Sequence, residues 1–122
     1  MSEHPEVAEF IHAYISSVWA LELLLLLRRD PERAWTAAAL VRELRASTSL
    51  VSDNLARLQQ QGLALEGDDG WRFHPANPRL AALVTELSAL YRERPMHVMS
   101  LIARSDSIRS LADAFRIRKD ET

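Results

Sequence analysis

The sequence predicts a mainly α-helical domain that also holds one short β-hairpin, and three patterns lead to this prediction. Apolar residues recur every three or four positions over most of the chain, which indicates helices with one apolar face. Residues 63–74 alternate between apolar and polar side chains on both sides of a turn rich in Gly and Asp, which is typical of a hairpin. The 122 residues, of which 48% are hydrophobic, suffice for one core, so we expect a single domain over residues 1–122.

The first predicted element is a long N-terminal helix over residues 5–29. The pattern fits one long helix or two abutting ones. Past Leu21 the residues are apolar all round, so we expect this end to be the central core helix. Asp30-Pro31 ends it, because proline disfavours helical geometry in the residue before it. One face of this segment is a continuous apolar stripe of Val7, Phe10, Ile11, Tyr14, Ile15, Val18 and Trp19.

Two short helices separated by a brief break are predicted next. Thr36 is a suitable N-cap for the first, and Ser47 or Thr48 for the second, which runs to Gln61. Gly62 supplies the left-handed conformation that ends a helix. Two such helices make a helix-turn-helix. Their inward faces are Leu40, Val41 and Leu44 in the first helix, and Val51, Leu55 and Leu58 in the second.

The predicted hairpin follows the second helix directly. Its turn is Gly67-Asp68-Asp69-Gly70, and alternation places Trp71 and Phe73 on one face, where we expect them to pack under the hairpin. A hairpin in this position is a wing. The predicted fold class is therefore mainly α with an α+β wing: a winged helix-turn-helix over residues 36–75, with a long N-terminal helix and a C-terminal helical extension.

Helical periodicity returns over residues 78–119, and Pro95 interrupts it. A domain of this type needs only about 70 residues for its own core, so apolar faces on the outer helices are left to be covered. We expect Phe10, Tyr14, Leu111 and Phe115 to be covered by a second copy in a homodimer. The alternative is a monomer whose extra helices fold back on the domain.

The sequence lacks the residues that are characteristic of several functional classes. There is no cysteine, and the four histidines match no metal-ligand spacing, so we expect no metal and no other cofactor. With three glycines and no catalytic motif, the chain offers no residues for an enzyme. The apolar run 18–27 is too short to cross a membrane, and the N-terminus has no export signal, which together favour the cytoplasm.

A resemblance to a known family rests on residues 35–66, WTAAALVRELRASTSLVSDNLARLQQQGLALE. This segment of the chain resembles the winged-helix transcription regulators of bacteria, especially the MarR-like group. The matching residues are Leu40, Leu44, Val51, Ser52, Leu55, Leu58, Gly62 and Leu63. The resemblance implies binding to double-stranded DNA, with the second helix in the major groove and the wing on phosphates.

The resemblance implies that four side chains contact base edges or phosphates: Thr48, Ser49, Ser52 and Asn54. Arg57 and Arg72 would supply positive charge. Serine and threonine hydroxyls donate to phosphate oxygens, and asparagine pairs with adenine, so these side chains have suitable chemistry.

The sequence departs from the regulator pattern in its charges. Asp53 and the turn residues Asp68 and Asp69 stand where basic residues are usual, and Leu50 is apolar at an often polar position. Residues 36–78 carry four basic and five acidic side chains, which weakens attraction to phosphate. These departures favour an alternative, a winged-helix protein-interaction module that modulates the transcription machinery without binding DNA. Its contact surface would be the basic segment 79–119, with eight basic and four acidic side chains.

Overall fold

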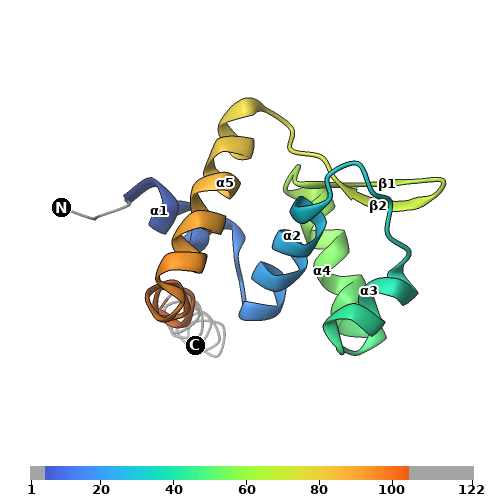
Figure 1. Cartoon of the computed structure of the whole chain (residues 1–122), viewed down its shortest axis with the longest axis horizontal. Coiled ribbons are helices and arrows are strands. Elements are labelled where there is room, and N and C mark those ends of the chain that lie inside the picture. The colour runs from blue at the N-terminus through green and yellow to red at the C-terminus, as the bar shows by residue number, and fades with distance from the viewer. Residues whose placement is uncertain (1–4, 105–122) are drawn as a thin grey trace, which may run out of the picture.

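The computed structural model describes residues 5–104 of the chain. Within them the protein is mostly helical, with a small two-stranded antiparallel sheet (Figure 1). The elements in order are α1 (Pro5–Tyr14), α2 (Val18–Arg29), α3 (Ala37–Leu44), α4 (Thr48–Gln60), β1 (Ala64–Gly67), β2 (Gly70–Phe73) and α5 (Pro78–Glu93). Residues 95–104 are helical again after a break at Arg94, as Pro95 predicts.

Of the two possibilities predicted for residues 5–29, one long helix or two abutting ones, the structure contains two helices rather than one long helix. The segment forms α1 and α2, whose axes are bent by 108° at a break of three residues. Ser17 begins the second helix, because its hydroxyl accepts a hydrogen bond from the Ala20 N–H at 3.1 Å. Such a cap satisfies an N–H group that the first turn leaves without a partner. The apolar stripe runs through the break because Ile15 is buried although it is not helical.

The predicted starts of the following helices are confirmed. Thr36 caps α3, and its hydroxyl accepts from the Ala39 N–H at 3.1 Å. Ser47, the first of the two candidates, caps α4 in the same way. Each cap is a short-range contact between a side chain and the backbone three residues later, which is why the local sequence could indicate it.

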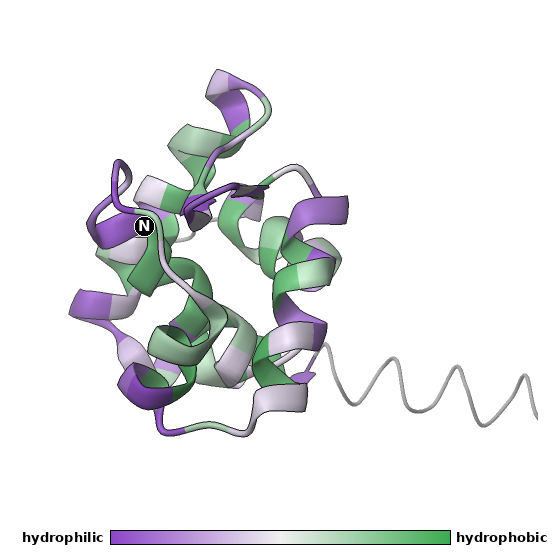
Figure 2. Cartoon of the chain, turned by 90° about the vertical axis from the view of Figure 1, so that its right-hand side faces the viewer, coloured by the Kyte–Doolittle hydropathy of each residue, from purple (hydrophilic) through white to green (hydrophobic). Residues whose placement is uncertain are grey.

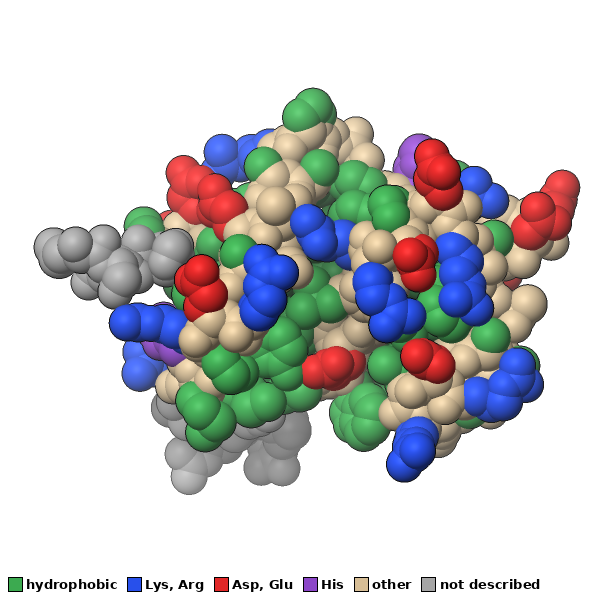
Figure 3. All heavy atoms as spheres, in the orientation of Figure 1, with side chains coloured by type: hydrophobic (Ala, Val, Ile, Leu, Met, Phe, Trp, Pro, Cys, Tyr) green, Lys and Arg blue, Asp and Glu red, His purple; other side chains and the backbone are tan. Residues whose placement is uncertain are grey.

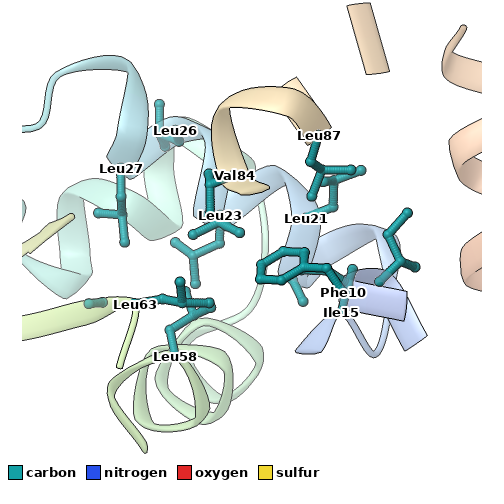
Figure 4. Packing of buried hydrophobic residues seen from close by; sticks show 14 of the residues in the cluster. Phe10, Ile15, Leu21, Leu23, Leu26, Leu27, Leu58, Leu63, Val84 and Leu87 are labelled. Carbon is teal, nitrogen blue, oxygen red and sulfur yellow. The ribbon is translucent and has the colours of Figure 1, made fainter. Parts of the chain in front are cut away.

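The core is built around α2. Figure 4 shows Leu23 of α2 between Val84 of α5 and Leu58 of α4, with Leu27 one turn further along α2. These four side chains are essentially buried, as expected for a helix that is apolar all round. In the turned view, the hydrophilic residues lie mainly along the outer surfaces of the helices (Figure 2).

The hairpin is fixed to the chain before α3. Trp35 and Trp71 exchange two backbone hydrogen bonds of 2.7 Å, so the outer edge of β2 gains an isolated bridge. Within the hairpin, Leu65 pairs with Arg72 and Ala64 with Phe73. Trp71 and Phe73 are half-buried and pack against the core, which confirms their predicted place under the hairpin.

The expectation that Phe10 presents an uncovered apolar face is wrong. Its ring is only 3% exposed in the single chain, and it stacks on Tyr14 with 4.8 Å between ring centroids. The break between α1 and α2 lets α1 turn against α5, which covers the ring. Tyr14 is half-buried. Leu111 and Phe115, the other two residues expected at a dimer interface, lie outside the described residues, as does the predicted helix beyond residue 104.

Among residues 5–104, no single helix is long and apolar enough to cross a membrane. Helices α1 and α2 reach the required length and composition only as a pair, across their 108° bend.

Candidate nucleic-acid interface

Helix α4 is held with one face inward and the other toward solvent. Val51, Leu55 and Leu58 are each no more than 2% exposed, as the apolar stripe predicts. They anchor α4 against the core beside α2 and α3. Among residues 5–104, the opposite face of the helix is exposed.

Four of the six predicted DNA-contacting residues lie on the exposed surface of α4. Thr48 and Ser49 are in its first turn, Ser52 is one turn further, and Arg57 is near its end. The Ser49 hydroxyl lies 3.4 Å from the hydroxyl of the capping Ser47. Hydroxyl groups thus cluster at the N-terminus of α4, where the helix dipole favours an anion.

Asn54 differs from its prediction, because it does not face outward. It is half-buried and lines a shallow hollow with Trp19 and Val51. Its side-chain amide donates to the Leu50 carbonyl oxygen at 2.8 Å, so a donor needed to read a base is used within the helix. The helical wheel explains the difference, since position 54 is three residues after Val51 and four before Leu58, which both face inward, and so lies at the boundary of the two faces.

Arg72 lies on the hairpin. It is directly opposite Leu65 in the antiparallel pair, so the two side chains share the face away from Trp71 and Phe73. Leu65 is 43% exposed, and Arg72 is half-buried. Any contact of Arg72 with a partner would therefore be made by the outer face of the hairpin.

Sequence reasoning missed three arginines near the predicted interface. Arg42 is exposed on α3, and Arg45 is exposed in the turn before α4 with a left-handed φ of 55°. The Arg33 guanidinium lies 3.5 Å from the centre of the Trp35 ring, beside the strand bridge that holds the hairpin. The positions of Arg42 and Arg45 in the sequence could have indicated this. Residues at the end of α3 and in the following turn lie next to the start of α4.

Acidic side chains share this surface. Asp53 is exposed on the outward side of α4, and Asp68 and Asp69 are exposed at the hairpin turn. Figure 3 shows acidic atoms at the far right end of the molecule, where the hairpin projects, with basic and acidic side chains interspersed beside it. The surface is mixed in charge rather than uniformly basic.

An apolar surface adjoins the start of α4. Trp19 is 43% exposed and Val18 36% exposed at the beginning of α2. Trp19 also borders the shallow hollow, whose other walls include Leu44 of α3 and Leu50 of α4. Leu50 is half-buried there, among the residues that line the hollow. We call Val18, Trp19 and Leu50 the Trp19 surface.

Comparison of this chain with protein-family models, curated proteins and solved structures finds no match. A functional assignment therefore has to come from the arrangement of residues described above.

Proposed function

We propose that this chain is a winged helix-turn-helix protein that binds duplex DNA through the outward face of α4. The observation that carries the proposal is the placement of α4, whose apolar side is buried while hydroxyl groups and Arg57 stand exposed on the rest of its surface. The short turn from α3 and the hairpin after α4 support the same assignment. The protein would act as a transcriptional regulator in the cytoplasm, without catalysis and without a cofactor.

Each group has a role that its chemistry permits. The hydroxyls of Thr48, Ser49 and Ser52 can donate to phosphates or base edges at the entry of α4 into a major groove. Arg57 would neutralise phosphate from the far end of the helix. Arg72 would do so from the hairpin face, with the missed Arg45 beside the first turn of α4.

The charge balance predicts how such binding behaves. Asp53 is exposed on the same helix, and Asp68 and Asp69 at the hairpin turn are repelled by phosphate. Few basic side chains of the protein then remain to neutralise phosphates and release the counterions of the DNA. We therefore expect an affinity for DNA that is modest at physiological salt and measurable at low salt. A homodimer would raise the affinity by presenting two such helices to two half-sites.

Fluorescence anisotropy with labelled duplex fragments, at about 50 mM and about 150 mM salt, tests this proposal. We expect saturable binding at micromolar protein at the lower salt, weakened at the higher. Lack of binding to any fragment at the lower salt would reject DNA binding, because even non-specific binders are retained under such conditions.

The Trp19 surface favours a second candidate function, a protein-interaction module with the same fold. A tryptophan that is 43% exposed beside an exposed valine is an unusual surface feature, and tryptophan is enriched at protein interfaces. The acidic residues of α4 and the hairpin would be no obstacle to a protein partner. In this case α4 would be a structural helix rather than a DNA reader.

Site-specific photo-crosslinking distinguishes the second candidate from the first. A crosslinker at position 19 should give one discrete protein adduct in cells, whereas one at the exposed position of Glu86 on α5 should not. Absence of an adduct at position 19, together with DNA binding in the anisotropy assay, would contradict the interaction module.

A further inference from the structure

A second site lies between α1 and the start of α5, away from the hairpin and from the hydroxyl-bearing turn of α4. An open groove of about 300 Å³ runs between these helices. This volume is at the lower end of the range for small-molecule pockets, so it suits a small ligand with up to about a dozen heavy atoms. Figure 3 shows acidic and basic side chains close together where α1 approaches the first turns of α5.

The floor of the groove is apolar and partly aromatic. Phe10 and Tyr14 of α1 stack with an interplanar angle of 14°, and Leu80 and Leu83 of α5 complete the floor. Phe10, Leu80 and Leu83 are buried by the chain, so the floor is part of the core and is preformed. Such a floor can accept a branched or aromatic side chain of a ligand.

The two walls carry opposite charges. Glu6 and Glu9 line the α1 wall, while Arg79 lines the α5 wall. Within the part of the chain that the structure describes, these three side chains are free of ion pairs with the protein. Because both helices are anchored by buried residues, the carboxylates stay on one wall and the guanidinium on the other.

The backbone adds little to the positive wall, so Arg79 is its main anion-binding group. The Leu80 N–H is already bonded to the Asn77 side chain at 2.9 Å, and Pro78 has no N–H to donate. A ligand carboxylate would be held by the Arg79 guanidinium, whose planar fork suits a bidentate contact.

We propose that this groove binds a small zwitterion with an apolar side chain, of the chemical class of apolar α-amino acids. The ligand's ammonium group meets the carboxylates of Glu6 and Glu9, its carboxylate meets Arg79, and its side chain covers the aromatic floor. A purely cationic or purely anionic ligand leaves one wall unsatisfied. The site is independent of DNA binding, so its test needs no DNA.

Isothermal titration calorimetry with L-phenylalanine and L-leucine tests the proposal on the whole chain. We expect saturable binding to the wild type, and binding about tenfold weaker for phenethylamine, which lacks the carboxylate, and for 3-phenylpropionate, which lacks the ammonium group. Arg79→Gln and Glu9→Gln should each weaken binding of the amino acid several-fold. Ala13→Phe, which places a ring in the groove, should abolish it.

Matched controls are Arg92→Gln and Glu86→Gln, which change the same charges at exposed positions of α5 outside the groove. Both should bind the amino acid like the wild type. Circular dichroism confirms that each variant is folded. The proposal is overturned if neither amino acid gives a saturable signal at about 10 mM, a concentration beyond most specific small-molecule sites. Equal binding of the two single-charge analogues, or unchanged binding by Arg79→Gln and Glu9→Gln, would also overturn it.

Discussion

Gly70 is the residue where two segments of the chain approach most closely. It has a φ of +135°, a region that side-chain-bearing residues rarely adopt. A Cβ atom at this position would clash with the Trp35 carbonyl oxygen and would lie 2.7 Å from the carbonyl carbon. The hairpin can therefore reach the segment before α3 only because residue 70 has no side chain.

We predict that Gly70→Ala lowers the free energy of unfolding by about 1–3 kcal/mol, since the strained backbone and the clash both act in the folded state. Gly67→Ala is the matched control, because its Cβ would meet only an atom at 3.8 Å. Urea denaturation of the two variants measures the difference. Equal stabilities would mean that the bridge between Trp35 and Trp71 does not constrain the hairpin.

Tyr91 gives a prediction for the pH dependence of stability. Its hydroxyl donates to the Glu22 carboxylate at 2.7 Å, and this hydrogen bond, with burial and the Glu22 charge, raises the pKa of Tyr91 to about 12 from 10.0. The folded-state pKa is the higher one, so the stabilisation is complete below pH 10 and is lost as the pH rises through about 12.

Tyr91→Phe should accordingly lower stability at neutral pH by about 0.5–1.5 kcal/mol, and its deficit should shrink above pH 10. The absorbance titration of phenolate should show one group ionising near pH 12 in the wild type and not in Tyr91→Phe. Tyr14→Phe, which keeps the stacked ring on Phe10, is the control and should retain that late titration. Titration of Tyr91 near pH 10 would contradict the hydrogen bond.

At the level of elements, the position of α4 depends on its buried stripe. Leu55 is 1% exposed at the centre of this stripe, between Val51 and Leu58. We predict that Leu55→Ala destabilises the protein by about 2–5 kcal/mol, because it leaves a cavity in the core. Leu65→Ala, at a position 43% exposed, makes the same chemical change and should cost less than about 1 kcal/mol. Similar losses for both would mean that α4 is not anchored by this face.

Helices α3 and α4, their caps and the hairpin could be predicted from the sequence because local patterns determine them. Thr36 and Ser47 are caps whose bonds span three residues, and Gly62 ends α4 with its expected left-handed φ of 75°. The position of the break at residues 15–17 could not be predicted, because buried Ile15 continues the apolar stripe through it. A periodicity argument detects which face is buried and does not detect where the axis turns.

The candidate site was predicted less completely, for two physical reasons. Residues at the boundary of a helix face can point either way, and Asn54 is held half-buried by a hydrogen bond to the Leu50 carbonyl oxygen. Long-range contacts leave no local signal, so neither the bridge from Trp35 to the hairpin nor the groove between α1 and α5 could be derived from spacing. Four exposed residues of α4 could be derived, because they lie opposite a clear apolar stripe.

At the scale of the whole molecule, the proposed homodimer depends on the C-terminal segment, since Phe10 is buried within the single chain. We predict that the wild type sediments as a dimer at micromolar concentration and that Leu111→Glu with Phe115→Glu gives a monomer. Burying two unpaired carboxylates in an apolar interface is strongly unfavourable. Leu65→Glu, at the exposed hairpin position, is the control and should leave the dimer intact. A monomeric wild type would show that one chain covers its own apolar faces.

If the outward face of α4 binds DNA, as we propose, then Arg57→Ala should change both the affinity for DNA and its dependence on salt. Arg57 is exposed on α4, and Arg92→Ala removes the same charge from an exposed position on α5. We predict that Arg57→Ala weakens binding about threefold to tenfold at low salt, and that the slope of log affinity against log salt becomes shallower by about one. Arg92→Ala should match the wild type in both quantities. Identical affinities and slopes for all three proteins would contradict the assignment of α4 as the DNA-binding helix.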